Sequence, residues 1–365
     1  MGFKCGIVGL PNVGKSTLFN ALTQTASAQA ENYPFCTIEP NVGEVAVPEA
    51  RLDTIADLGK SAQRVPARMN FVDIAGLVKG ASKGEGLGNQ FLANIRETDA
   101  ILYVLRSFDD ENVTHVEGRI DPLDDYETVE TELMLADLES LEKRRVNLEK
   151  KAKQGDKDAK QTLRLVDVAI GVLSDGKPAR TAEIDEDDAK AWRMLQLLTS
   201  KPVLYVANVD EDSAATGNAY SDKVVAHAEA QGAEAVVISA KIESELALLE
   251  PEEREEYLQE LGLEEPGLNR LIRAGYKLLG LRTYFTVGPK EARAWTFVDG
   301  WTAPQCAGVI HTDLQKGFIR AETTKFEDFV EHAGEQGAKE AGKTRQEGKD
   351  YLVQDGDILL IRHNS

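Results

Sequence analysis

The chain contains little cysteine and no long apolar run. Its three cysteines (Cys5, Cys36 and Cys306) are far apart and lack the paired spacing of metal ligands, so we expect them to carry no chemistry. No apolar run approaches the ~20 residues that span a bilayer, and no basic segment of a signal peptide precedes the first strand. We therefore expect a protein of the reducing cytoplasm, with no membrane partner.

Positive charge is also scarce in this chain. It has 42 Lys and Arg against 62 Asp and Glu, a formal net charge of −20. Such an acidic surface argues against nucleic-acid binding by the whole molecule, so any RNA contact needs a local basic patch. With 365 residues, 42% of them hydrophobic, the chain is long enough for two or three domains.

Near the N-terminus, residues 9–17 read Gly-Leu-Pro-Asn-Val-Gly-Lys-Ser-Thr and fit the phosphate-loop pattern G-x-x-x-x-G-K-[ST]. A strand is predicted before them at 5–8 and a helix after them, so backbone N–H groups and a helix N-terminus would face a phosphate. Lys15 would reach the β- and γ-phosphates, which makes it a catalytic candidate too, and Ser16 would ligate Mg²⁺. The predicted nucleotide contacts of this loop are Asn12, Val13, Gly14, Lys15, Ser16 and Thr17.

Two further segments complete the predicted magnesium and γ-phosphate site. A strand at 69–73 ends in D-x-x-G, where Asp73 would hold Mg²⁺ and the Gly76 N–H would sense the γ-phosphate. Thr37 is the candidate for a third oxygen ligand to Mg²⁺. The glycine-rich stretch 80–88 is predicted as a loop ordered by the γ-phosphate, with a plain surface loop as the alternative.

The base-binding residues are predicted at the ends of two later strands. The strand at 202–208 delivers N-V-D-E, and the strand at 236–238 delivers S-A-K. Proteins that select guanine place N-K-x-D and S-A-K there, and their Asp accepts hydrogen bonds from guanine. Here Glu211 replaces that Asp, which favours ATP over GTP, although Asp210 is an alternative carboxylate. The predicted contacts are Asn208, Val209, Glu211, Ser239, Ala240 and Lys241.

Taken together, these motifs resemble the YchF / Obg-like ATPase family of translation-factor-related P-loop proteins. The resemblance implies an ATP-preferring protein with a helical insertion, a TGS domain and association with the ribosome, either its large subunit or the whole particle. The segments that carry it are 9–22, 32–43, 71–100, 205–211, 239–241, 284–289 and 292–297.

The spacing of the motifs predicts an insertion in an α/β nucleotide-binding domain. Asp73 and Asn208 are separated by about 75 residues more than a compact domain of this kind needs. Residues 138–152 have apolar positions three and four apart, Gln154–Asp156 form a turn, and 166–173 continue the pattern. We therefore expect two antiparallel helices in a coiled-coil hairpin.

The tip of this hairpin is basic. Nine Lys or Arg lie between Lys143 and Arg164, against three acidic residues. On so acidic a chain this is the candidate surface for RNA or the ribosome, and the alternative is an ordinary solvated helix face.

From residue 281 the pattern changes to strands. We expect strands at 284–287, 293–297 and 357–361, a turn and strand at 307–311, and a short helix at 326–330. This order fits a small β-grasp domain, as the TGS resemblance implies, with a binding role. The predicted domains are therefore 1–122 with 199–280 for nucleotide, 123–198 for the insertion, and 281–365 for TGS, in a monomeric protein.

Hydrolysis should be slow, because the residue after D-x-x-G is Leu77, where many GTPases have a glutamine that orients the attacking water. His115, after the strand at 101–105, is a candidate to orient that water instead. Asn12 is a separate candidate, as a ligand of K⁺. The alternatives to a regulatory ATPase are the same switch run by GTP, and a nucleotide-gated ribosome-binding module whose hydrolysis is incidental.

Overall fold

The computed structural model describes residues 3–30, 41–74, 87–110 and 119–364, without the side chains of 26–30 and 87–89. Contacts divide the chain into two compact units. The first consists mainly of Phe3–Gly43 and Asn70–Arg270, and the second mainly of Glu44–Met69 and Leu271–Ser365.

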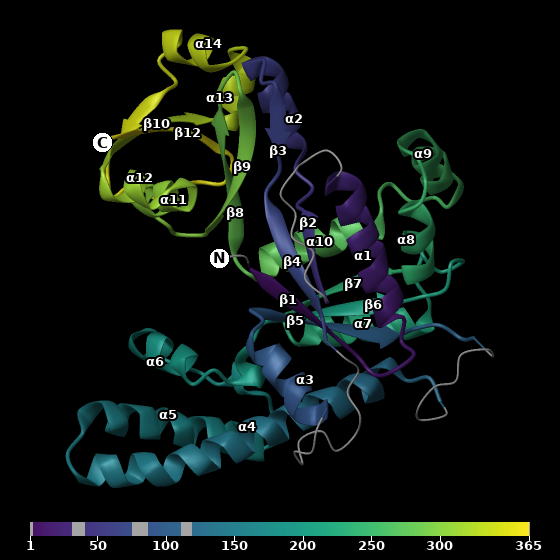
Figure 1. Cartoon of the computed structure of the whole chain (residues 1–365). Coiled ribbons are helices and arrows are strands. Elements are labelled where there is room, and N and C mark those ends of the chain that lie inside the picture. The colour runs from purple at the N-terminus through teal and green to yellow at the C-terminus, as the bar shows by residue number, and fades with distance from the viewer. Residues whose placement is uncertain (1–2, 31–40, 75–86, 111–118, 365) are drawn as a thin grey trace. The chain divides into compact units, whose positions relative to one another are not determined.

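The first unit is built mainly on a sheet of six strands, although residues 44–46 and 68–69 of this sheet are assigned to the second unit (Figure 1). In spatial order they are β2 (Val42–Ala46), β4 (Arg68–Asp73), β1 (Lys4–Val8), β5 (Ala100–Arg106), β6 (Val203–Asn208) and β7 (Glu234–Ile238). From β4 to β7 all neighbours pair in parallel. Every residue of β5 and β6 is buried, which explains why both strands are continuous apolar runs rather than alternating ones. The strands predicted around the nucleotide motifs are confirmed.

Helices connect or follow these strands. Apart from the helices of the hairpin and its return, they are α1 (Lys15–Ala30), α3 (Leu87–Arg96), α7 (Ala219–Ala230), α8 (Ala240–Leu246), α9 (Pro251–Glu260) and α10 (Gly267–Leu278). Several begin at side chains that satisfy free backbone N–H groups, as at the capping box of Asn218 and Ser221 before α7 and at Ser239 before α8. Among the helices described, none is both long and apolar enough to cross a bilayer.

The predicted helical hairpin is confirmed as α4 (Pro122–Lys153) and α5 (Lys157–Ser174) (Figure 1). Asp121 and Asp156 cap the two helices, and Gly155 makes the turn with φ 93°, a conformation that favours glycine. Between the helices lies an apolar cluster that includes Leu141 and Val166. Shorter pieces then return the chain to the sheet: η2 (Ala179–Thr181), η3 (Glu186–Asp188), α6 (Ala189–Met194) and η4 (Leu198–Ser200).

Buried polar contacts join the base of α4 to the sheet. The Glu130 carboxylate accepts a hydrogen bond from Tyr103 of β5, and it pairs with Arg180 of η2 at 2.7 Å. Farther along α4, Asp137 accepts hydrogen bonds from the N–H groups of Leu198 and Thr199, at 2.8 and 2.9 Å. Because a buried carboxylate without partners would be costly, these contacts fix the position of the helix.

The second unit contains a separate sheet of six strands (Figure 1). In spatial order they are β11 (Arg345–Glu347), β10 (Phe318–Lys325), β12 (Asp357–His363), β8 (Leu281–Val287), β9 (Glu291–Val298) and β3 (Gln63–Val65). Its helices are α2 (Ala50–Gly59), α11 (Ala303–Ile310), α12 (Thr312–Lys316), α13 (Phe326–Glu331) and α14 (Glu335–Glu340). The strands expected at 284–287, 293–297 and 357–361 and the short helix at 326–330 are confirmed.

The turn and strand expected at 307–311 are wrong. Residues 303–310 form helix α11 instead. Thr302 and Gln305 make a capping box, and proline occupies the first helical turn, where its missing N–H costs nothing. The apolar Val309 and Ile310 suggested a strand, but the capping box and the proline favour a helix that includes both residues.

The division into units also differs from the predicted domain boundaries. Residues 44–69 contact the C-terminal part, because β3 pairs with β9 and α2 packs against β8 and β9. The hairpin belongs to the first unit rather than forming one of its own. Sequence spacing could not show either feature, since both depend on contacts between segments far apart in the chain.

Candidate nucleotide site

The phosphate loop follows β1 and leads into α1. Asn12 and Gly14 adopt left-handed backbone conformations, with φ of 64° and 91°. At Gly14 a Cβ atom would lie 2.0 Å from Nδ2 of Asn208, so both the conformation and the space require glycine there. Asn12 tolerates this region better than most residues with side chains. The loop is thus wound tightly at the start of a helix, as phosphate binding needs.

Lys15 and Asp73 meet at the carboxyl end of the sheet. The Lys15 ammonium lies 2.6 Å from the Asp73 carboxylate, and the two side chains are 8% and 18% exposed. β4 delivers Asp73 beside Ile7, the residue paired with it on β1. The fold therefore joins two predicted site residues that lie 58 positions apart in the chain.

The oxygen donors beside this pair suit magnesium. Ser16, in the first turn of α1, is exposed and follows Lys15 directly, and Asp73 places a carboxylate on Lys15. Hydroxyl and carboxylate oxygens are the ligands that Mg²⁺ prefers. Thr37 and Gly76 lie outside the described residues, as do Leu77, His115 and most of the glycine-rich stretch.

Asn208 connects the phosphate loop with the S-A-K segment. Its side-chain amide donates to the Val13 carbonyl at 2.9 Å, and its oxygen accepts from the Ala240 N–H at 2.9 Å. The residue is only 4% exposed. These contacts leave one N–H of the amide without an acceptor among the described residues.

The remaining base candidates divide into buried and exposed ones. Val209 is 3% exposed, and its N–H donates to the Ile238 carbonyl. Its part in the structure is therefore a backbone hydrogen bond and a buried apolar side chain. Glu211 pairs with Lys241 at 2.6 Å, with both side chains partly exposed. The hydrogen bond from Lys241 to Glu211 raises the pKa of Lys241. Ser239 accepts from the Ile242 N–H and starts α8.

Two features near the site were not predicted. Asn208 uses most of its hydrogen-bonding capacity to hold protein segments together, a role that only the spatial meeting of β6 with the loop reveals. Arg106, at the end of β5, is 1% exposed. The sequence does show a charged residue at the end of an otherwise apolar strand, and that pattern could have drawn attention to Arg106.

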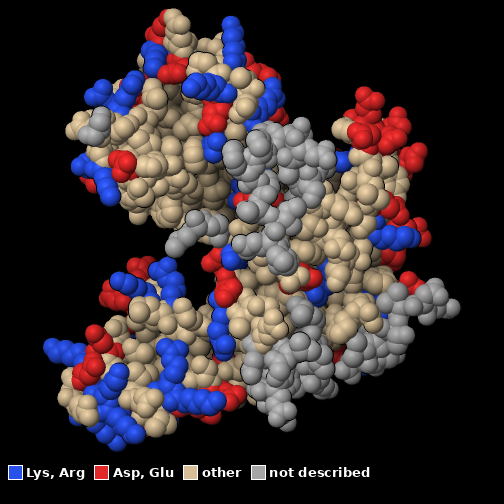
Figure 2. All heavy atoms as spheres, in the orientation of Figure 1, with Lys and Arg blue, Asp and Glu red and all other residues tan. Residues whose placement is uncertain are grey.

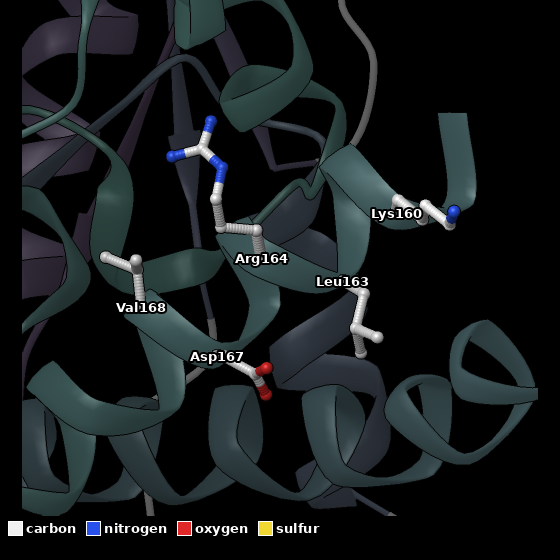
Figure 3. A pocket seen from close by; sticks show the side chains of 5 residues that line it. All are labelled: Lys160, Leu163, Arg164, Asp167 and Val168. Carbon is white, nitrogen blue, oxygen red and sulfur yellow. The ribbon is translucent and has the colours of Figure 1, made fainter. Parts of the chain in front are cut away.

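A separate hollow lies on the hairpin rather than at the phosphate loop. It has a volume of about 520 Å³ and is open to solvent. All its lining side chains belong to α5 (Figure 3): Lys160, Leu163, Arg164, Asp167 and Val168. None of them is a predicted nucleotide contact.

Family models match two parts of the chain. The model MMR_HSR1, described as "50S ribosome-binding GTPase", matches residues 4–129. The model YchF-GTPase_C, described as "Protein of unknown function (DUF933)", matches residues 281–364.

Full-length relatives and solved structures are also similar. The chain is 58% identical over 364 residues to the "Ribosome-binding ATPase YchF" of Haemophilus ducreyi and 55% identical over 366 residues to that of Bacillus subtilis, covering 100% of each. The structure of the Schizosaccharomyces pombe YchF GTPase superposes with a TM-score of 0.88 at 37% identity, over 99% of this chain and 98% of that one. The chain therefore belongs to the YchF family, with its P-loop nucleotide domain, long helical insertion and C-terminal domain.

Proposed function

We propose that this protein is a ribosome-associated regulatory ATPase that binds ATP with Mg²⁺, hydrolyses it slowly and thereby changes its affinity for the ribosome. The relatives compared above bear the name "Ribosome-binding ATPase". The observation that carries the proposal is the meeting of the phosphate loop, Asp73 and Asn208 at one edge of the sheet. In parallel α/β sheets ligands bind at this edge.

In this site Lys15 would exchange the Asp73 carboxylate for the β- and γ-phosphates. Ser16 and Asp73, with Thr37, would hold Mg²⁺, which neutralises phosphate charge when it is bound. Asn12 remains the candidate for a K⁺ ligand. Gly76 and the segments 32–37 and 76–88 would respond to the γ-phosphate and carry the switch.

The base subsite favours adenine. Asn208 can donate its remaining N–H to N7. A carboxylate facing the base would select guanine, because guanine has N1–H and 2-amino donors that adenine lacks. The carboxylate of Glu211 is instead engaged by Lys241, which lowers its value as an acceptor for a base.

The surface proposed to meet the ribosome is the hairpin tip. Figure 2 shows Lys and Arg gathered over the region of α4 and α5. Some of these cations pair within the protein, as Arg145 does with Asp167. Five exposed lysines have no ion-pair partner in the described part of the chain: Lys150, Lys151, Lys153, Lys157 and Lys160. Unpaired, exposed cations on an acidic protein suit the phosphates of ribosomal RNA.

The proposal is tested by sedimentation of the full chain with ribosomes in three states: without nucleotide, with ADP, and with a nonhydrolysable ATP analogue. We expect the fraction bound to differ between the ADP and ATP-analogue states. Equal binding in all three would leave a ribosome-binding protein without a switch, and no binding would remove the ribosome from the proposal. Gel filtration of the same samples tests the expected monomer.

A further inference from the structure

Arg106 is a charged side chain in an apolar setting. It ends β5, every residue of which is buried, and it is itself 1% exposed. Placing a guanidinium in a protein interior costs several kcal/mol unless its N–H groups are bonded. A strand of this kind would be more easily completed by an apolar residue, so the contacts of Arg106 indicate what its charge is for.

The guanidinium contacts the segment of residues 107–110, which follows the strand. It donates to the carbonyls of Phe108 at 3.2 Å and Asp110 at 3.3 Å, and it lies 4.7 Å from the centroid of the Phe108 ring. Two carbonyls of the segment 107–110 therefore bond one buried cation. Carbonyl acceptors for a charged donor make stronger hydrogen bonds than neutral pairs do.

The segment 107–110 lies against the end of β6, the strand that carries Asn208. Arg106 is paired in register with Asn208, and the N–H of Ser107 donates to the Asn208 carbonyl at 2.8 Å. On its other side, Asn218 donates to the Ser107 carbonyl at 2.7 Å. The Asp110 carboxylate is near enough to act on the charge of Lys241, the partner of Glu211.

We infer that Arg106 is a positioning residue for the base subsite. It fixes the segment 107–110, which lies beside Asn208, Glu211 and Lys241 and forms one side of that subsite. This inference rests on the proposed function, since it assumes that ATP occupies the site. Arg106 itself need not touch the nucleotide. Loss of the Arg106 side chain should make the segment 107–110 less ordered beside the base. The phosphate loop, which is held by Asn208 and Lys15, should keep its geometry.

The test compares a ligand with a base to one without. Affinities for ATP and for inorganic tripolyphosphate, both with Mg²⁺, are measured on the full chain by calorimetry for the parent, Arg106→Met and Arg106→Lys. We expect Arg106→Met to weaken ATP binding about tenfold and to leave tripolyphosphate binding unchanged. Arg106→Lys should recover part of the ATP affinity, because an ammonium donates to one carbonyl but does not reproduce the planar fork.

Arg180→Met is the matched control. It also removes an arginine with internal polar partners from the first unit. The Arg180 side chain is 17% exposed, and its partners are Glu130, Tyr126 and Thr199. Both methionine variants should melt at a lower temperature, and only the Arg106 variant should lose affinity for ATP relative to tripolyphosphate. If Arg106→Met fails to fold, Arg106→Lys carries the same comparison. Equal losses for both ligands, or no loss for ATP, would overturn the inference, whereas a parent that binds tripolyphosphate but not ATP would overturn the proposed function.

Discussion

The contact between Lys15 and Asp73 shows how the site depends on single residues. The ammonium is 8% exposed and already lies beside the carboxylate proposed to hold Mg²⁺. Lys15 is therefore placed where it can pass from a carboxylate to a phosphate by a small movement of its side chain. The glycine at position 14 is required for a different reason, because Asn208 occupies the space of a Cβ atom.

Lys15→Ala should abolish tight nucleotide binding. The β- and γ-phosphates would lose their fixed cation, and Asp73 would lose its partner. Equilibrium binding of fluorescent ATP to the parent and the variant measures the effect, and circular dichroism checks that the variant is folded. Near-normal affinity in a folded variant would contradict the assignment of the phosphate loop.

Two residues compete for the role of the missing glutamine. If His115 orients the attacking water, His115→Ala should lower the single-turnover rate by the low end of the ~10²–10⁴-fold range, or less, with ATP affinity unchanged. If Asn12 holds an activating K⁺, the rate should instead collapse when Na⁺ replaces K⁺. Measuring both proteins in both salts separates the two. An unchanged rate for His115→Ala would leave this histidine without a catalytic role.

At the scale of elements, α4 links the sheet to the basic tip. It is a single helix of 32 residues, on the order of 50 Å long, whose base is held by buried contacts of Glu130 and Asp137. Tyr126 of α4 also packs edge-on against Tyr103 and Tyr205 of the central strands and close to His227 of α7.

His227 should make the stability of the first unit depend on pH. Burial lowers the pKa of this histidine below its ordinary 6.5, although the nearby Glu127 opposes the shift. The unfolded chain therefore binds the proton more readily, and the free energy of unfolding should fall as pH drops from about 6.5 through the lowered pKa. Urea denaturation between pH 5 and 8 should show a shallower dependence for His227→Gln. The exposed His363→Gln serves as the control and should follow the parent.

The five unpaired tip lysines should dominate the salt dependence of ribosome binding. Changing all five to Gln should weaken binding and reduce the slope of log K against log [salt] by about 0.7–0.9 for each RNA phosphate that the variant no longer neutralises. The matched control changes five other exposed lysines to Gln, for the same net charge: Lys60, Lys177, Lys223, Lys290 and Lys349. If the two variants behave alike, general charge and not the tip determines binding.

Sequence patterns predicted the elements better than their assembly. Apolar spacing located the hairpin, including its turn at Gly155, because each helix must bury one face against the other. The same reasoning failed at 307–311, where apolar residues fit a strand or a helix and the capping box of Thr302 decided. Pattern could not show that 44–69 contact the C-terminal unit, since β3 is only three residues long and pairs with a distant strand.

For the site, the motifs located the residues but not their partners. The motifs placed Lys15 and Asp73 in one phosphate and magnesium site, but the ion pair between them is visible only in the structure. Likewise, the engagement of Glu211 by Lys241 and the use of Asn208 as a link between segments depend on how loops turn after the strands end. The position of Arg106 at the end of an apolar strand is visible in the sequence, but its burial and its contacts with residues 107–110 are visible only in the folded sheet.

At the scale of the whole molecule, the net charge of −20 and the basic hairpin tip act in opposite directions. An acidic surface repels nucleic acid in general, so the proposed binding to RNA would be limited to the place where cations gather. Such a molecule would approach RNA in one orientation. The nucleotide site lies in the same unit as the hairpin, which is a condition for the proposed control of ribosome binding by ATP.

The most direct measurement is a calorimetric titration of the purified full chain with ATP and with GTP in the same Mg²⁺ buffer. We predict that ATP binds at least severalfold more tightly, and that Val209→Lys with Glu211→Asp shifts the preference toward GTP by restoring an acceptor for the guanine edge. Glu211→Asp alone controls for the burial of position 209. Tighter binding of GTP by the parent would contradict the account.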